Sequence, residues 1–193
     1  ITAGTPASRQ RGSAGTSAAI ATVSDTETAA GSLSVTATTV PTGITVSNIV
    51  NTNGNVTATV SAGCGAALGN NTVVLTVTDA NSGTSTANFT VNVTANTAPT
   101  LTYGNASVSA GGATANTPTT ATDNGSISSY AVQNQGTYTG TISVNASGVV
   151  SISAAAPVGS HTITIRAADN CEAFTDATFT LNVGNNNPTI TAG

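Results

Sequence analysis

The sequence of 193 residues has little charge and few large side chains. Methionine, tryptophan and lysine are absent, charged residues make up 5% of the chain, and aromatic residues make up 3%. The only basic residues are Arg9, Arg11 and Arg166, and the formal net charge is −4. Nucleic-acid binding requires a basic surface, which this composition does not supply. No apolar run approaches the roughly 18 residues of a membrane helix, so no membrane span is expected in this fragment.

The helix-favouring residues Glu, Lys, Gln, Arg, Met and Leu are also scarce, whereas Val, Ile and Thr, which favour strands, are abundant. Thr, Ser, Asn and Gly together account for more than half of the chain. A chain of this kind can be disordered, but 38% of the residues are hydrophobic and they occur in alternating runs. Alternation of this kind is typical of packed sheets, so the sequence predicts an all-β protein.

An internal repeat indicates two modules. Residues 84–104 read TSTANFTVNVTANTAPTLTYG, and residues 175–193 read TDATFTLNVGNNNPTITAG, with Phe89 matching Phe179. The period is about 90 to 100 residues, which is the size of one β-sandwich module.

The frame of the repeat sets the expected domain boundaries. Residues 1–4 (ITAG) recur as residues 190–193 (ITAG), and residues 101–104 (LTYG) form the middle copy. We therefore expect this chain to be a window from a longer array of modules. The predicted units are one module at residues 1–96, a second at residues 97–187, and the start of a following module at residues 188–193.

Each module contains about seven short apolar runs separated by turn residues. The pair Asn53-Gly54 predicts a tight hairpin because both residues accept positive φ, and Ser147-Gly148 holds the same place in the second module. Seven strands at this spacing predict a Greek-key sandwich. The strands are expected at residues 1–8, 17–24, 33–39, 43–50, 55–61, 71–79 and 85–94, and at 100–109, 113–122, 127–133, 138–145, 148–154, 160–168 and 174–183.

The segments VTDANSGTSTANFTVNV and IRAADNCEAFTDATFTLNV, with the linkers NTAPTLT and NNNPTIT, carry a family resemblance. They resemble the immunoglobulin-like or cadherin-like tandem repeats of large bacterial surface and secreted proteins. The resemblance implies two tandem immunoglobulin-like Greek-key β-sandwiches of about seven strands each, located outside the cell or at its surface, in a bacterium. The tryptophan and the intradomain cysteine pair of antibody domains are missing.

The two cysteines occupy different places in the two modules. Cys64 precedes the sixth strand of the first module, whereas Cys171 follows the sixth strand of the second. In a head-to-tail array of such sandwiches, both loops lie at the joint between the modules. We therefore expect an interdomain disulfide between Cys64 and Cys171, which fits an oxidising compartment. Two free buried thiols, or a bond between neighbouring chains, remain as alternatives.

The seven acidic residues fall in or beside two sets of loops, those after the second and the sixth strand of each module. Oxygen ligands that converge at a joint can bind Ca²⁺, and the candidate ligands are Asp123, Asp169 and Asn170. The alternative is that Asp and Asn stabilise turns through their own backbone. The linker lacks the aspartates of cadherin joints. No cofactor other than this calcium is expected.

No arrangement of residues predicts catalysis. His161 is the only histidine, and a Ser–His–Asp site would need Asp169 or Asp176 and a serine to converge on it. His161 matches Asn71 of the first module, which predicts a surface residue at the start of a strand instead. One histidine and two separated cysteines give no zinc spacing.

The sequence therefore predicts a non-catalytic structural module of a long extracellular repeat protein that forms a stalk or filament at the cell surface. Its expected partners are neighbouring modules of the same chain and further copies in a homopolymer or filament, with no nucleic acid. Exposed edge strands offer a route to such association. The alternative is an adhesin segment that binds carbohydrate or protein ligands through its loop tips. An enzyme is the third and least favoured reading.

Overall fold

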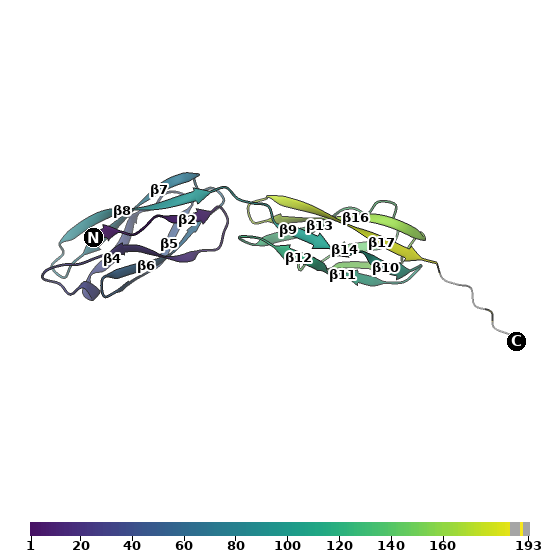
Figure 1. Cartoon of the computed structure of the whole chain (residues 1–193), viewed down its shortest axis with the longest axis horizontal. Helices are drawn as coiled ribbons and strands as arrows, with labels where there is room; N and C mark the ends of the chain where they lie inside the picture. The colour runs from purple at the N-terminus through teal and green to yellow at the C-terminus, as the bar shows by residue number, and fades with distance from the viewer. Residues whose placement is uncertain (186–189, 191–193) are drawn as a thin grey trace. The chain divides into compact units, whose positions relative to one another are not determined.

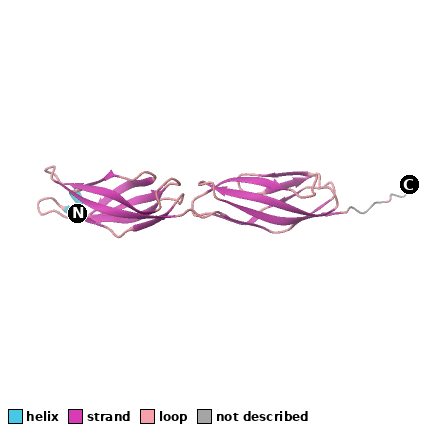
Figure 2. Cartoon of the chain, turned by 90° about the horizontal axis from the view of Figure 1, so that it is seen from above, coloured by secondary structure: helices cyan, strands magenta, loops and turns pink. Residues whose placement is uncertain are grey.

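The computed structural model describes residues 1–185 and 190, and most of these residues lie in strands that loops connect (Figure 2). The only helix among them is a 3-10 turn, η1 (Ala30–Ser32). The chain divides into two compact units, residues 1–96 (unit 1) and 97–193 (unit 2). The expected start of a following module at residues 188–193 lies, apart from Ile190, outside the described residues.

Unit 1 is a sandwich of two four-stranded sheets, ordered β1-β3-β6-β5 and β2-β8-β7-β4 (Figure 1). Paired strands are antiparallel except β2 and β8, which run parallel. The bounds are β1 (Thr2–Ala3), β2 (Ala7–Gln10), β3 (Thr16–Thr22), β4 (Ser34–Thr39), β5 (Ile44–Thr52), β6 (Asn55–Ala62), β7 (Gly69–Thr78) and β8 (Thr84–Thr94).

Unit 2 repeats this topology with one interruption. One sheet is ordered β10-β17-β16-β13, and the other is divided into β11-β15-β14 and β12-β9. The division falls at Thr117, where Asn116 turns inward and its Nδ2 donates to the Gly104 carbonyl at 2.8 Å. The bounds are β9 (Thr100–Tyr103), β10 (Ala106–Ser109), β11 (Thr114–Asn116), β12 (Pro118–Thr122), β13 (Ile127–Asn134), β14 (Thr141–Val144), β15 (Val150–Ser153), β16 (Gly159–Asp169) and β17 (Phe174–Gly184).

The predicted fold class is confirmed, because both units are β-sandwiches with an immunoglobulin-like strand order. The expected first strand of each unit is divided, however, so that its halves join different sheets. In unit 1 the break falls at Gly4 and Pro6. The Gly4 amide donates to the Ile20 carbonyl at 2.8 Å, and Pro6 has no amide proton with which to continue a ladder.

Each unit has its own apolar core. The matched Phe89 and Phe179 are 0% and 3% exposed, and they lie among the alternating apolar residues of the last two strands. Tyr138 is also buried, and its hydroxyl donates to the Ser153 carbonyl at 2.9 Å. The segment around Tyr138 therefore leaves the sheet, and β14 begins at Thr141 rather than at residue 138.

Candidate functional site

The loop that carries Cys64 joins β6 to β7 and is held firmly against unit 1. Ala66 is fully buried, and the Arg11 Nε donates to its carbonyl at 2.6 Å. Gly43 approaches the same residue closely, since a Cβ added at Gly43 would lie 2.7 Å from the Ala66 amide nitrogen. The backbone beside Cys64 is thereby fixed.

The turn that carries Cys171 joins β16 to β17 and is organised by a buried carboxylate. Asp169 is 2% exposed, and its Oδ1 accepts hydrogen bonds from the Cys171 amide at 2.7 Å and the Ala173 amide at 3.0 Å. The Asn170 amide donates to the Ser126 carbonyl at 3.0 Å, so the turn lies beside the loop that follows β12. Cys64 lies before β7, the sixth main strand of unit 1, and Cys171 lies after β16, the sixth main strand of unit 2. Both positions agree with the prediction.

Neither cysteine is free in the part of the chain that the structure describes, and both are disulfide-bonded. The reading of two free buried thiols is therefore wrong. A disulfide suits an extracellular location, because the reducing cytosol keeps most thiols reduced.

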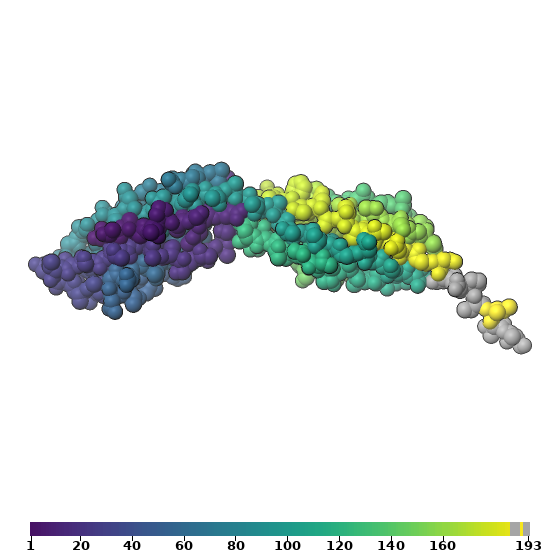
Figure 3. Space-filling model, in the orientation of Figure 1, coloured from purple at the N-terminus to yellow at the C-terminus, as the bar shows by residue number. Residues whose placement is uncertain are grey.

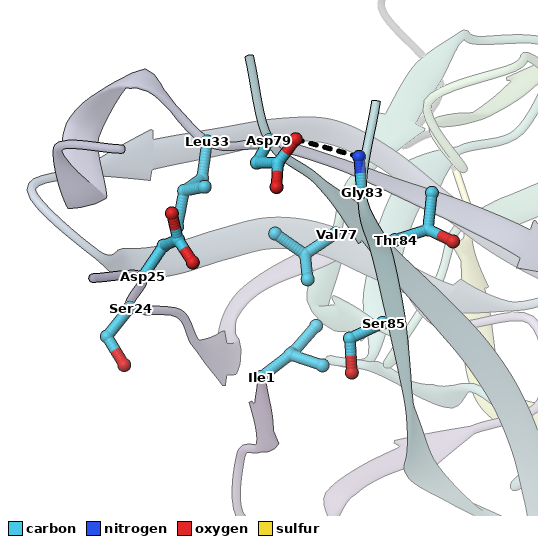
Figure 4. Close-up of a pocket in the computed structure, with 9 residues that line it drawn as sticks. All are labelled: Ile1, Ser24, Asp25, Leu33, Val77, Asp79, Gly83, Thr84 and Ser85. Carbon is cyan, nitrogen blue, oxygen red and sulfur yellow. Dashed lines mark hydrogen bonds between the residues drawn. The ribbon is translucent and has the colours of Figure 1, made fainter. Parts of the chain in front are cut away.

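In unit 1, the acidic loops meet at a cavity of about 210 Å³. Figure 4 shows its lining, with Ile1 and Ser85 on one side and Asp25 and Leu33 across from them. Asp79 Oδ1 accepts hydrogen bonds from the Asn81 and Gly83 amides, both at 2.8 Å. The lining residues are Ile1, Ser24, Asp25, Leu33, Val77, Asp79, Gly83, Thr84 and Ser85.

The carboxylates of this cavity are already engaged by the backbone. The amides of Thr28 and Glu27 donate to Asp25 Oδ2 at 2.7 and 3.1 Å, and these bonds lower the pKa of the Asp25 carboxyl. Asp25 and Asp79 thus fulfil the turn-stabilising role that was the alternative to metal binding. The cavity is lined by residues of β7 and β8, by Ile1 and by the adjoining loops, and no sequence motif predicts it.

In unit 2, the candidate calcium ligands lie in two adjacent loops. Asp123 Oδ2 accepts a hydrogen bond from the Gly125 amide at 2.7 Å, whereas Asp123 Oδ1 is buried with no hydrogen-bond partner among the described residues. Asp169, the last residue of β16, is the register partner of Ile127, the first residue of β13. Asn170 is exposed. Within residues 1–185 and 190, no three His, Cys, Asp or Glu side chains come together as a metal site.

His161 lies at the start of a long strand, as expected, but the prediction that it is a surface residue is wrong. Its ring is 3% exposed, with Nε2 2.8 Å from the Pro157 carbonyl and Nδ1 2.8 Å from Thr137 Oγ1. A carbonyl only accepts, so Nε2 carries a proton toward Pro157. The matched Asn71 is also buried and donates to two carbonyls of its own loop. Both residues secure the loop before the strand through contacts with its backbone.

Tyr103 is partly buried and packs against the core of unit 2. Its ring lies 5.5 Å from that of Phe179, and its hydroxyl donates to the Gly148 carbonyl. Burial, with a smaller effect of Tyr130, raises the pKa of Tyr103 to about 12. Tyr103 therefore anchors β9 to the hairpin between β14 and β15.

The three arginines make local contacts. Arg9 donates to the carbonyls of Val60, Ser8 and Thr16, at 2.8, 2.7 and 3.0 Å. Arg166 forms a two-pronged pair with Asp176, in which both bonds are 2.8 Å long.

Residues 1–185 and 190 contain no helix that is both long and apolar enough to cross a membrane.

Comparisons with known proteins give no family. No family model matches the chain, and no curated protein matches it. Among solved structures, an endo-fucoidan hydrolase of glycoside hydrolase family 107 matches 95% of this chain and 28% of its own, at 13% identity and a TM-score of 0.46.

Two further structures illustrate the range of the likeness. The extracellular cadherin domains 1–5 of protocadherin gamma B2 match 90% of this chain and 41% of their own, at 15% identity and a TM-score of 0.41. Domains 4–9 of the surface layer protein SbsC match 86% of this chain and 24% of their own, at 17% identity and a TM-score of 0.42. The chain thus spans well under half of these structures. At such scores the likenesses add nothing to what the strand order itself shows.

Proposed function

We propose that this chain is a non-catalytic structural segment of an extracellular repeat protein, and that it builds a stalk or filament at the surface of a bacterial cell. The observation that carries the proposal is the repetition of one sandwich within a single chain. Matched residues serve matched local roles in both copies, as Asp79 and Asp169 do in their turns and Asn71 and His161 do in their loops. A repeated framework with its polar groups engaged by its own backbone suits a spacer better than a reaction site.

We propose further that the disulfide joins Cys64 to Cys171. Three facts support this pairing: the chain has two cysteines, neither is free in the described part of the chain, and the backbone beside each is held in place. Such a bond limits how far two successive units bend relative to each other. It also places the protein in an oxidising compartment.

Trypsin tests the pairing directly, because the chain has only three cleavage sites. Complete digestion under non-reducing conditions gives the fragments 12–166 and 167–193, and the bond keeps them together as one mass that separates on reduction. The Cys64→Ser variant gives two separate masses under both conditions. A bond between chains is recognised by an intact dimer on a non-reducing gel, and that result would overturn the pairing within one chain.

We also keep calcium binding at Asp123, Asp169 and Asn170 as a proposal. The buried Asp123 Oδ1, which lacks a hydrogen-bond donor among the described residues, is the atom that favours it. Ca²⁺ takes six to eight oxygen ligands, so backbone carbonyls and water would have to supply most of them. A melting temperature for unit 2 that is the same in millimolar calcium and in a chelator rejects this site.

Electron microscopy tests the structural role. Strands of 11 residues, such as β8 and β17, span about 36 Å at about 3.3 Å per residue, so with loops and linker each unit extends about 4 nm. We expect native material, or the concentrated chain, to form fibres with this repeat. If the isolated chain instead shows saturable binding on a glycan array and forms no fibres, the adhesin function replaces the structural one.

A further inference from the structure

The hairpin between β5 and β6 contains an Asn-Gly pair that its backbone requires. Asn53 has a φ of +50° and Gly54 a φ of +93°, and Asn and Gly are the residues that adopt such values most readily. A Cβ added at Gly54 would also lie 2.6 Å from the Val23 carbonyl oxygen. A larger residue at position 54 would therefore strain the hairpin.

An asparagine that precedes glycine is prone to deamidation, because no Cβ shields the next amide. The glycine amide nitrogen attacks the asparagine Cγ, and a cyclic succinimide forms. The Cγ–Nδ2 bond breaks, and ammonia leaves with the proton of the glycine amide. Water then opens the ring to aspartate or isoaspartate. The product has one more negative charge, and isoaspartate also lengthens the backbone of the turn.

In unit 1, the attacking amide is held by a side chain. The Gly54 amide donates to Asn51 Oδ1 at 2.8 Å, and attack on Asn53 requires this hydrogen bond to break. Asn51 is itself fixed, because its Nδ2 donates to the carbonyls of Ala30 and Leu33 at 2.7 and 2.8 Å. The acceptor therefore stays in place opposite the glycine amide.

In unit 2, the pair Asn124-Gly125 lies between β12 and β13 and has a stronger acceptor. The Gly125 amide donates to Asp123 Oδ2 at 2.7 Å. A hydrogen bond to a carboxylate is stronger than one to a neutral amide oxygen. The sequence contains no other Asn-Gly pair. In both pairs, then, a side chain that precedes the asparagine holds the amide that follows it.

The pair Asn81-Ser82, the only Asn-Ser pair of the sequence, provides a comparison. The Ser82 amide donates to the Asp79 backbone carbonyl at 3.3 Å, which is a longer and weaker hydrogen bond. Asn53 and Asn81 are both exposed, and residues from purple to teal reach the surface of unit 1 in Figure 3. Water reaches both asparagines, so the hydrogen bond of the following amide distinguishes them.

We propose that Asn53 and Asn124 are latent deamidation sites, and that Asn51 and Asp123 suppress the reaction by holding the glycine amide that would attack. Asn81 is the least protected of the three asparagines. This inference goes beyond the proposed function and does not depend on it. It explains how the chain keeps two Asn-Gly turns intact in water.

Peptide mass spectrometry tests the protection. The full chain is incubated at neutral pH with a chelator, once folded and once in urea, and the rate of conversion of amide to acid is measured at each asparagine. The rate in urea should exceed the rate in the folded chain at least about fivefold at Asn53 and tenfold at Asn124, or about 1.0 and 1.4 kcal/mol in the barrier. The ratio should be smaller at Asn81. Equal rates in the two states at either Asn-Gly pair, or a ratio at Asn81 above both of the others, overturn the proposal.

Variants separate the held amide from the general rigidity of the fold. Asp123→Ala should raise the rate at Asn124 in the folded chain at least about tenfold and leave Asn53 unchanged. Asn134→Ala is the matched control in unit 2, because its Oδ1 also accepts a hydrogen bond at 2.7 Å from an amide two residues on, that of Gly136. No Asn-Gly pair follows it, so the rate at Asn124 should stay the same.

Asn51→Ala gives the reciprocal result, with a faster reaction at Asn53 only. Circular dichroism checks that each variant is folded at the temperature of incubation. Asp123→Asn keeps an oxygen acceptor and should retain most of the protection, so it tests the proposal even if Asn51→Ala does not fold. An unchanged rate at Asn124 in Asp123→Ala, or equal increases in Asp123→Ala and Asn134→Ala, would show that the held amide does not set the rate.

Discussion

Asp169 offers the sharpest test of how the Cys171 turn is built. Its buried Oδ1 accepts hydrogen bonds from the amides of Cys171 and Ala173, and Asp169→Ala removes both hydrogen bonds at once. A hydrogen bond to a charged group contributes about 1.5–3 kcal/mol, but the buried carboxylate also has a desolvation cost that the alanine no longer bears. We therefore expect the free energy of unfolding of unit 2 to fall by about 3 kcal/mol.

For a unit of this size, each kcal/mol shifts the melting temperature by about 4–8 °C, so the expected decrease is roughly 12–24 °C. Differential scanning calorimetry resolves it as a shift of the unit 2 transition. Asp169→Asn keeps one oxygen acceptor and should lose about half as much, and Glu172→Gln controls for the loss of one negative charge in the same turn. The equivalent Asp79→Ala should shift the unit 1 transition instead. A loss below about 1 kcal/mol for Asp169→Ala would show that the turn holds without its carboxylate.

Further predictions concern the pH response and one loop contact. Because the folded state raises the pKa of Tyr103 from 10.0 to about 12, its stabilising contribution is complete below pH 10 and is lost as the pH rises to about 12. Unit 2, which contains all three tyrosines, should therefore unfold at a lower pH than unit 1 in alkaline buffer. The Tyr103→Phe variant should show a weaker dependence of the stability of unit 2 on pH, measured by circular dichroism. Gly43→Ala should destabilise unit 1 by about 1–3 kcal/mol in urea titration, because φ is +81° there and the new Cβ meets Ala66. An unchanged urea midpoint would show that the loop around Ala66 moves to accommodate the new Cβ at no cost in stability.

The strand pattern was predictable because alternation and turn residues are local signals. β8, expected at residues 85–94 and found at Thr84–Thr94, and β16, expected at residues 160–168 and found at Gly159–Asp169, are examples. The division of the first strand was not predictable, since it depends on how closely Gly4 approaches a strand fifteen residues away in sequence.

The site was predictable only in part. The strand order predicts the loops that hold both cysteines, but Asp169 and Asp176 lie within β16 and β17. The match of His161 to Asn71 predicts an exposed residue at the start of a strand, but both side chains turn inward to bind their own loop. The cavity beside Ile1 has no sequence signal, because its lining combines residues of β7 and β8 with Ile1 and residues 24–33, which no sequence spacing connects.

The parallel pairing of β2 with β8, and of β10 with β17, has a consequence for tension. In each unit a short strand near the beginning, β2 or β10, runs in the same direction as the last strand, with four register pairs between them. A pull on the two ends of a unit therefore drags these strands in opposite directions along their length, and their hydrogen bonds are loaded together in shear rather than opened one by one. Each sandwich is thereby built to bear load along the chain, with the resisting patch located where the polypeptide enters and leaves it.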